Sequence, residues 1–163
     1  MTVRLGEVMV EQGLLTRDQV RCILKEQQAL KRPFGELAER LFGVSERDVE
    51  MAWARQYAGI AEHIDPRDQP IEAELLALID RRQAWQFRML PLRRDGEEIM
   101  VATMVEHLPR ALRFAIRHFN EPCYLVICSP EALGEALMHN YPLNGMTAKS
   151  VFGGAGVGSD QTD

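Results

Sequence analysis

Apolar residues in the first third of the chain recur every three to four positions, which is the spacing of an amphipathic helix. Residues 5–9 and 34–41 each carry a short stripe of this kind, and a longer helical pattern follows each of them. Both longer segments open on a hydroxyl residue, Thr16 or Ser45, whose oxygen can accept a hydrogen bond from the first helical turn. We therefore expect about four helices, which end near Gly59.

From residue 60 onward the pattern changes to that of a small mixed domain. Asp95-Gly96, between two apolar segments, is the strongest hairpin signal in the chain. Ser129-Pro130 is typical of the start of a helix. In order, the expected elements are one or two helices over 71–87, strands at 88–94 and 97–104, a helix over 109–119, a strand at 123–128 and a helix over 130–139. The predicted fold class is α+β: a tandem helical repeat followed by a small α/β unit with about three strands.

The two helical pairs look like copies of one unit. Arg4-Leu5-Gly6-Glu7 opens the first, and Pro33-Phe34-Gly35-Glu36 opens the second 29 positions later. The same offset pairs Thr16 with Ser45, Val20 with Val49, Leu24 with Trp53, and Gln27 with Gln56. We expect a tandem helical repeat over 1–59, a small α/β subdomain over 60–141, and a glycine-rich flexible tail or linker over 142–163.

Charge restricts the kind of ligand. The chain has 163 residues and a net charge of −5, which argues against binding to a nucleic-acid polymer. The first 58 residues hold nine basic and nine acidic side chains, so a site for a small anion is better sought there. No apolar run approaches the roughly 18 residues of a membrane span, and no leader is evident. We expect a cytoplasmic protein without direct membrane insertion.

The residue types of catalysis do not form a recognisable pattern. No nucleophile is paired with a base, no two carboxylates share a catalytic spacing, and the glycine-rich segment 153–160 lacks the lysine of a phosphate loop. The four histidines suggest neither a shared metal nor a dyad, and we expect them at the surface or at caps. The three cysteines have apolar neighbours and are expected to be buried thiols. We expect no enzyme activity, no metal and no cofactor.

The first helical unit resembles the motif of the MshEN domain. Arg4-Leu5-Gly6, Met9, Gly13, Val20, Leu24 and Gln27 match that motif, and residues 88–96 look like the family's hairpin. The resemblance covers roughly residues 3–141. This domain lies at the N-terminus of many type II secretion and type IV pilus ATPases, and it is also attached to some bacterial glycosyltransferases. Members with both motifs are receptors for the second messenger cyclic di-GMP, which lies along the two helical repeats.

The resemblance implies a cyclic di-GMP site on the repeats. Val20, Leu24 and Gln27 stand at i, i+4 and i+7, so a helix places two apolar groups and one amide on one stripe. The apolar groups can lie against guanine, and Arg4 can pair with phosphate. Gly6 can let the ligand approach the backbone. The implied ligand-binding residues are Arg4, Leu5, Gly6, Met9, Val20, Leu24, Gln27, Arg32, Phe34, Gly35, Val49, Trp53 and Gln56.

The second repeat departs from the motif. Pro33 replaces the arginine, with Arg32 adjacent as a substitute, and Phe42 replaces a glycine. Trp53 could stack on guanine or fill the space left by Ala38. An alternative function is a nucleotide-independent docking module, in which the second repeat serves packing; other purine dinucleotides are a further alternative. The implied protein partner is an assembly ATPase, a membrane platform or a glycosyltransferase.

Overall fold

The computed structural model describes residues 5–45, 47–48, 50 and 59–152. Its helical part contains α1 (Leu5–Glu11), α2 (Arg17–Leu30) and α3 (Phe34–Phe42). Residues 47–48, 50 and 59–60 also have helical backbone. Most of the expected fourth helix lies outside the described residues.

The ends of these helices follow the predicted capping chemistry. The backbone N–H of Gln19 donates to Thr16 Oγ1 at 3.2 Å, and the backbone N–H of Thr16 donates to Gln19 Oε1 at 2.9 Å. Ser45 Oγ accepts from the backbone N–H three residues later at 3.1 Å. Gly13 and Gly43 adopt φ of +71° and +70°, which ends α1 and α3 where glycine is favoured. The hydroxyl caps predicted at Thr16 and Ser45 are confirmed.

The α/β unit is a three-stranded mixed sheet covered by helices, and the predicted α+β class is confirmed. Strands β1 (Leu90–Asp95) and β2 (Glu98–Thr103) form the antiparallel hairpin, and β3 (Cys123–Ile127) pairs with β2 in parallel. The connection between β2 and β3 contains α6 (Leu108–His118), whose apolar face is buried. This unit also contains the α-helices α5 (Arg81–Phe87) and α7 (Pro130–Asn140).

Two segments differ from their expected form. The first part of 71–87 is a 3-10 helix, η2 (Ala73–Leu78), and only α5 is an α-helix. In the expected flexible tail, η4 (Ala148–Phe152) packs against α7, and Val151 is only 1% exposed. The fit is close at Gly134, because a Cβ there would lie 2.1 Å from the carbonyl oxygen of Ala148. Residues 153–163 lie outside the described residues.

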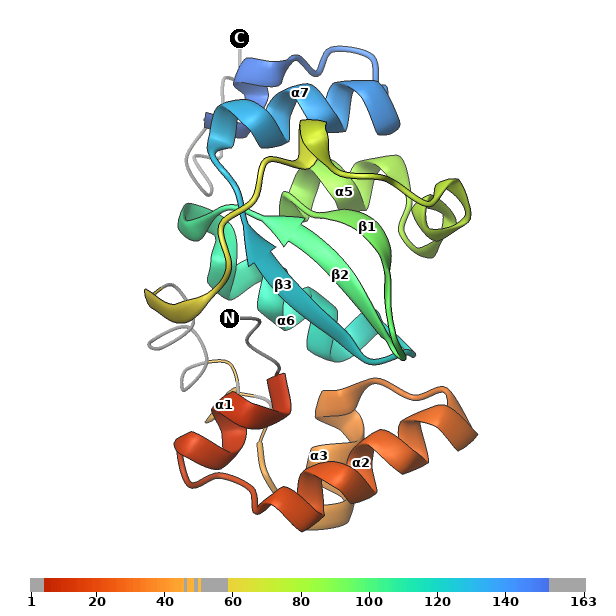
Figure 1. Cartoon of the computed structure of the whole chain (residues 1–163), viewed down its shortest axis with the longest axis vertical. Helices are drawn as coiled ribbons and strands as arrows, with labels where there is room; N and C mark the ends of the chain where they lie inside the picture. The colour runs from red at the N-terminus through yellow and green to blue at the C-terminus, as the bar shows by residue number, and fades with distance from the viewer. Residues whose placement is uncertain (1–4, 46, 49, 51–58, 153–163) are drawn as a thin grey trace, which may run out of the picture.

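Helices lie beyond both ends of the sheet, in addition to those that cover it. Figure 1 shows α1, α2 and α3 as a layer beyond the end at which the β1–β2 turn lies, while α7 lies beyond the other end. Gln28 Nε2 on α2 donates to Glu97 Oε2 in that turn at 2.6 Å. Helix α3 packs against α6. The helical layer, α1 to α3, therefore faces the hairpin end of the α/β unit.

The thiols differ from the sequence expectation at one position. Cys22 on α2 is exposed, whereas Cys123 and Cys128 are buried as expected. Burial raises the pKa of both Cys123 and Cys128 to about 12, so these two side chains are neutral thiols. Among the described residues, no helix is both long and apolar enough to cross a membrane.

His107 is buried at the N-cap position of α6, so of the two places expected for the histidines it occupies a cap and not the surface. It is 4% exposed at the start of α6 and makes no side-chain cap hydrogen bond. Burial lowers its pKa, as do the nearby charges of Arg88 and Arg110, and Glu106 opposes them. The folded protein therefore keeps a neutral imidazole where the unfolded chain would take up a proton.

A pH-dependent stability is expected from this histidine. The pKa of a histidine in an unfolded chain is about 6.5. Above that pH the imidazole of His107 is neutral in the folded and in the unfolded protein, and its contribution to the free energy of unfolding is fully present. As pH falls below that value, only the unfolded state gains the proton, and the free energy of unfolding decreases. Urea unfolding at about pH 7.5 and about pH 5.5 measures this effect. Between these two pH values, the free energy of unfolding should decrease less for His107→Gln than for the wild type. His139→Gln, which changes an exposed histidine on α7, should keep the wild-type dependence.

Candidate ligand-binding pocket

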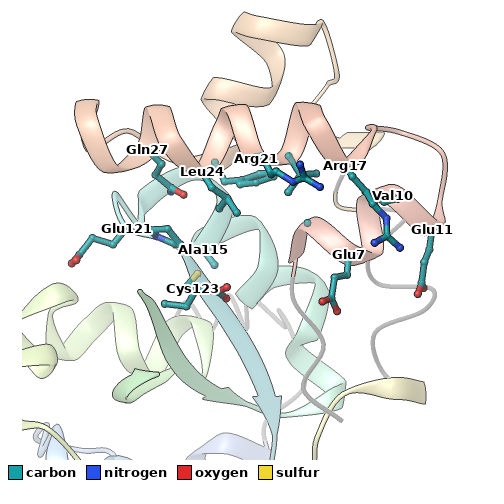
Figure 2. Close-up of a pocket in the computed structure, with 15 residues that line it drawn as sticks. Glu7, Val10, Glu11, Arg17, Arg21, Leu24, Gln27, Ala115, Glu121 and Cys123 are labelled. Carbon is teal, nitrogen blue, oxygen red and sulfur yellow. The ribbon is translucent and has the colours of Figure 1, made fainter. Parts of the chain in front are cut away.

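A pocket of about 410 Å³ lies between the helical layer and the α/β unit, and this is the size of a small-molecule site. Figure 2 shows α1 and α2 on one side and the end of the sheet with α6 on the other. From the helical layer it is lined by Gly6, Glu7, Val10, Glu11, Arg17, Val20, Arg21, Leu24, Gln27 and Phe34. From the α/β unit it is lined by Glu98, Ala115, Glu121, Pro122 and Cys123.

Helix α2 supplies most of one wall. Val20, Leu24 and Gln27 line the pocket together, as their spacing predicts. In Figure 2, Leu24 and Gln27 point from α2 toward Ala115 and Cys123 across the gap. The predicted stripe therefore faces the α/β unit.

Among the described residues that line the pocket, Gln27 has a buried polar atom without a hydrogen-bond partner. It is 1% exposed, and its Oε1 has no hydrogen-bond partner among the described residues. A buried acceptor without a partner lowers the free energy of unfolding by about 1–3 kcal/mol, because on folding it loses its hydrogen bonds to water and forms none with the protein. A donor that enters the pocket would remove this cost. The position of Gln27 therefore favours a ligand that presents hydrogen-bond donors.

Gly6 has a packing role that the sequence did not predict. A Cβ at this position would lie 2.3 Å from Val20 Cγ1, so glycine lets α1 cross α2 closely. Gly6 also lines the pocket. Helix packing alone explains the glycine, and the expected approach of a ligand to its backbone stays a prediction.

The other predicted site residues are buried, exposed or outside the described residues. Met9, Phe34 and Gly35 are buried. Of these three, only Phe34 lines the pocket. Arg32 is exposed, lies outside the pocket lining and pairs with Glu36 at 3.7 Å. Arg4, Val49, Trp53 and Gln56 lie outside the described residues, and only the backbone of Leu5 is described.

The pocket contains charged residues that the motif did not indicate. Arg17 and Arg21 come from the first half of α2, and Arg21 makes an exposed pair with Asp18 at 3.4 Å. The sequence could have indicated these two arginines, since both stand within one helical turn of Val20. Glu98 and Glu121 come from the α/β unit, and no periodicity in the helical repeat could have identified them.

The acidic side chains outnumber the basic ones among the lining residues, with Glu7, Glu11, Glu98 and Glu121 against the two arginines. Glu121 is held by Arg94 at 2.9 Å. Anionic phosphates would therefore be stabilised beside Arg17 and Arg21 and not among the carboxylates. The part of the pocket that is lined by carboxylates suits the edge of a nucleobase that carries hydrogen-bond donors.

The fold and the pocket define a two-layer α+β domain with a pocket between its layers. The family model described as the MshEN domain matches residues 57–146, which is more than half of the chain. This chain belongs to the MshEN domain family. The match covers the α/β unit and leaves out α1, α2 and α3, which carry the helical motif.

A search of the solved structures finds a structure described as "Structure of MshE with cdg". It is similar to this chain with 22% sequence identity and a TM-score of 0.43, over 85% of this chain and 99% of that chain. No curated protein matches the sequence.

Proposed function

We propose that this chain is a cyclic di-GMP-binding regulatory domain of the MshEN type. The observation that carries this proposal is the buried carbonyl of Gln27, which has no partner among the described residues, in a pocket whose lining includes several of the predicted motif residues. The family resemblance supports the same ligand, because members with both motifs bind cyclic di-GMP. We place the domain in the cytoplasm, where it would transmit ligand binding to a secretion, pilus or exopolysaccharide machine.

The pocket offers distinct surfaces for the parts of a guanine nucleotide. Val10, Val20, Leu24 and Phe34 supply apolar surface for the flat face of a base. Arg17 and Arg21 supply cationic groups for phosphate. Arg21 precedes Gln27 by six residues, about 9 Å along a helix, a span comparable to the length of one nucleotide. One half of the dinucleotide would occupy this pocket, and the other half would meet the second repeat.

A ligand in this position would contact both layers of the domain. The helical wall and the α/β wall come from different parts of the chain, so a bound nucleotide bridges them. Ligand binding favours whichever arrangement of the two layers it contacts best. A partner that recognises the arrangement of the layers would then respond to cyclic di-GMP. The partner we propose is an assembly ATPase, a membrane platform or a glycosyltransferase.

Gln27→Leu is expected to separate ligand binding from stability. Leucine fills a similar volume without the unpaired acceptor, so the free protein should be as stable as the wild type or slightly more stable. Loss of the ligand hydrogen bond should weaken cyclic di-GMP binding about tenfold, or about 1.4 kcal/mol. Isothermal titration calorimetry and urea unfolding measure the two quantities on the same samples.

A control glutamine keeps this test specific. Gln86→Leu changes an exposed glutamine on α5, away from the pocket, and should leave the affinity unchanged. Absence of any heat with the wild type would remove the proposed function. A Gln27→Leu protein that loses stability and keeps its affinity would show that Gln27 serves packing instead.

A second candidate is a docking module that does not need a nucleotide. The observation that favours it is in the second repeat, where Phe34 and Gly35 are buried and Arg32 lies outside the pocket lining. The described part of that repeat thus contributes mainly to packing. A partner that copurifies equally well with and without cyclic di-GMP, and equally well with wild type and Gln27→Leu, would support this candidate over the first.

A further inference from the structure

A hydrogen bond joins the two layers at the end of the pocket where Gln27 lies. Gln28 Nε2, on the next residue of α2, donates to Glu97 Oε2 in the β1–β2 turn at 2.6 Å, across 69 positions of sequence. Gln27 and Glu98, the sequence neighbours of these two residues, line the pocket. Because the acceptor is a carboxylate, the contact is a charge-assisted hydrogen bond. It therefore spans the gap between the two walls beside the ligand space.

Gln28 continues the face of α2 that is turned toward the pocket. Leu24, four residues earlier, lines the pocket, and residues four apart lie on the same face of a helix. In Figure 2, Leu24 points from α2 across the gap toward the α/β unit. A change in the spacing of the layers at Gln28 therefore moves the wall that holds Leu24 and Gln27.

The turn that presents Glu97 is held by its own unit. Tyr124 Oη donates to Asp95 Oδ2 at 2.6 Å, and Arg94 pairs with Glu121 at 2.9 Å. Tyr124 is itself fully buried in β3. The turn thus has little freedom to follow α2, so the hydrogen bond from Gln28 fixes α2 relative to the α/β unit.

Both partners of this hydrogen bond are exposed. Water competes for the same groups, so the bond contributes little to the free energy of unfolding. Two folded arrangements of a protein differ by less free energy than its folded and unfolded states do. A contribution that is small for folding is therefore large enough to shift the balance between two arrangements of the layers.

We propose that the Gln28–Glu97 hydrogen bond is a clasp that holds the helical layer and the α/β unit at the spacing that the ligand needs. Gln28 is then a positioning residue, which acts on the ligand through Leu24 and Gln27. When the clasp is broken, only part of the population keeps the closed spacing, and the apparent affinity falls in proportion to that fraction. The effect on affinity rests on the proposed function, whereas the effect on the spacing does not.

The spacing of the layers is measured first without ligand. Cys22 is exposed on α2, whereas Cys123 and Cys128 are buried neutral thiols, so a thiol-reactive spin label modifies Cys22 selectively. A second label at Met138→Cys, an exposed position on α7, gives the distance between the layers by double electron–electron resonance. With the clasp intact the distance distribution should be narrow. Gln28→Glu sets two carboxylates against each other and should broaden it.

A charge swap tests whether the effect belongs to this pair. Glu97→Lys turns the repulsion in Gln28→Glu into an attraction, so the double variant should regain the narrow distribution. Glu97→Lys alone gives the baseline for the double variant, because the amide oxygen of Gln28 can accept from the lysine. Ala29→Glu is the matched control. It adds the same charge at the next exposed position of α2 and should keep the narrow distribution.

Calorimetric titration with cyclic di-GMP then measures the consequence for binding on the same variants. Gln28→Glu should weaken binding about tenfold, and the double variant should bind within about twofold of Glu97→Lys. Ala29→Glu should bind as the wild type does. Urea unfolding should give similar midpoints for all these proteins, since the changed side chains are exposed. A merely structural role of Gln28 would not produce this recovery of affinity in the double variant.

The possible failures are distinguishable. An unchanged distance distribution in Gln28→Glu would overturn the clasp, whatever the titration shows. Broadening in Gln28→Glu without a loss of affinity would overturn its role in binding, while the proposed function stands. A wild type that binds no cyclic di-GMP would remove the proposed function, and the distances alone would then decide whether the clasp holds the layers. An equal effect of Ala29→Glu, or no recovery in the double variant, would attribute the changes to general charge and overturn the clasp.

Discussion

Replacing Trp85 with alanine is expected to lower the free energy of unfolding by about 3–5 kcal/mol. Trp85 is 2% exposed on α5 and is the largest of the fully buried side chains in the described part of the chain. Alanine would leave a cavity that the surrounding α/β core can close only in part. Urea unfolding followed by circular dichroism measures the loss.

A hydrogen-bond chain adds to this cost. Trp85 Nε1 donates to the backbone oxygen of Tyr141 at 2.8 Å, and Tyr141 Oη donates to the backbone oxygen of Leu76 at 2.8 Å. These two bonds join α5 to the end of α7 and to η2. Truncation of Trp85 therefore removes core volume and leaves an acceptor without its donor.

The control for Trp85→Ala is Gln86→Ala, its exposed neighbour on the same helix. This change should stay within about 0.5 kcal/mol of the wild type. A loss below about 1 kcal/mol for Trp85→Ala would contradict the structure, because it would mean that the core around α5 is loosely packed.

The α/β unit was predictable because strong local signals mark its elements. Asp95-Gly96 fixes the hairpin, and Ser129 accepts from the backbone N–H of Ala132 at 3.2 Å as the cap of α7. The packing of η4 on α7 was not predictable. It depends on contact between Gly134 and Ala148, which are distant in sequence and carry no periodic pattern.

Only one wall of the candidate site could be predicted. Periodicity shows which residues share a face of α2, and Val20, Leu24 and Gln27 do line one pocket. It cannot show what lies across from that face. The opposite wall, with Glu98 and Cys123, is brought there by the sheet and by the packing of α3 on α6. For the same reason the sequence predicts a ligand contact at Gly6 and not its close fit against Val20.

Leu24→Glu is expected to weaken cyclic di-GMP binding at least about 100-fold, which corresponds to about 2.7 kcal/mol. Leu24 points into the pocket beside Gln27 (Figure 2). Burying a leucine side chain contributes about 1.5–3 kcal/mol, and this contact with the base would be lost. The new carboxylate would also have to lose water when the ligand enters, and it would repel the phosphates. Calorimetric titration measures the change.

Leu30→Glu is the matched control, because it makes the same substitution on the same helix at a side chain that is 52% exposed and outside the pocket lining. Its affinity should equal that of the wild type. Thermal melting is needed for both variants, since Leu24 also packs against the core. Retained affinity in a folded Leu24→Glu protein would exclude this pocket as the ligand site. An equal loss in both variants would show a general effect of charge on α2.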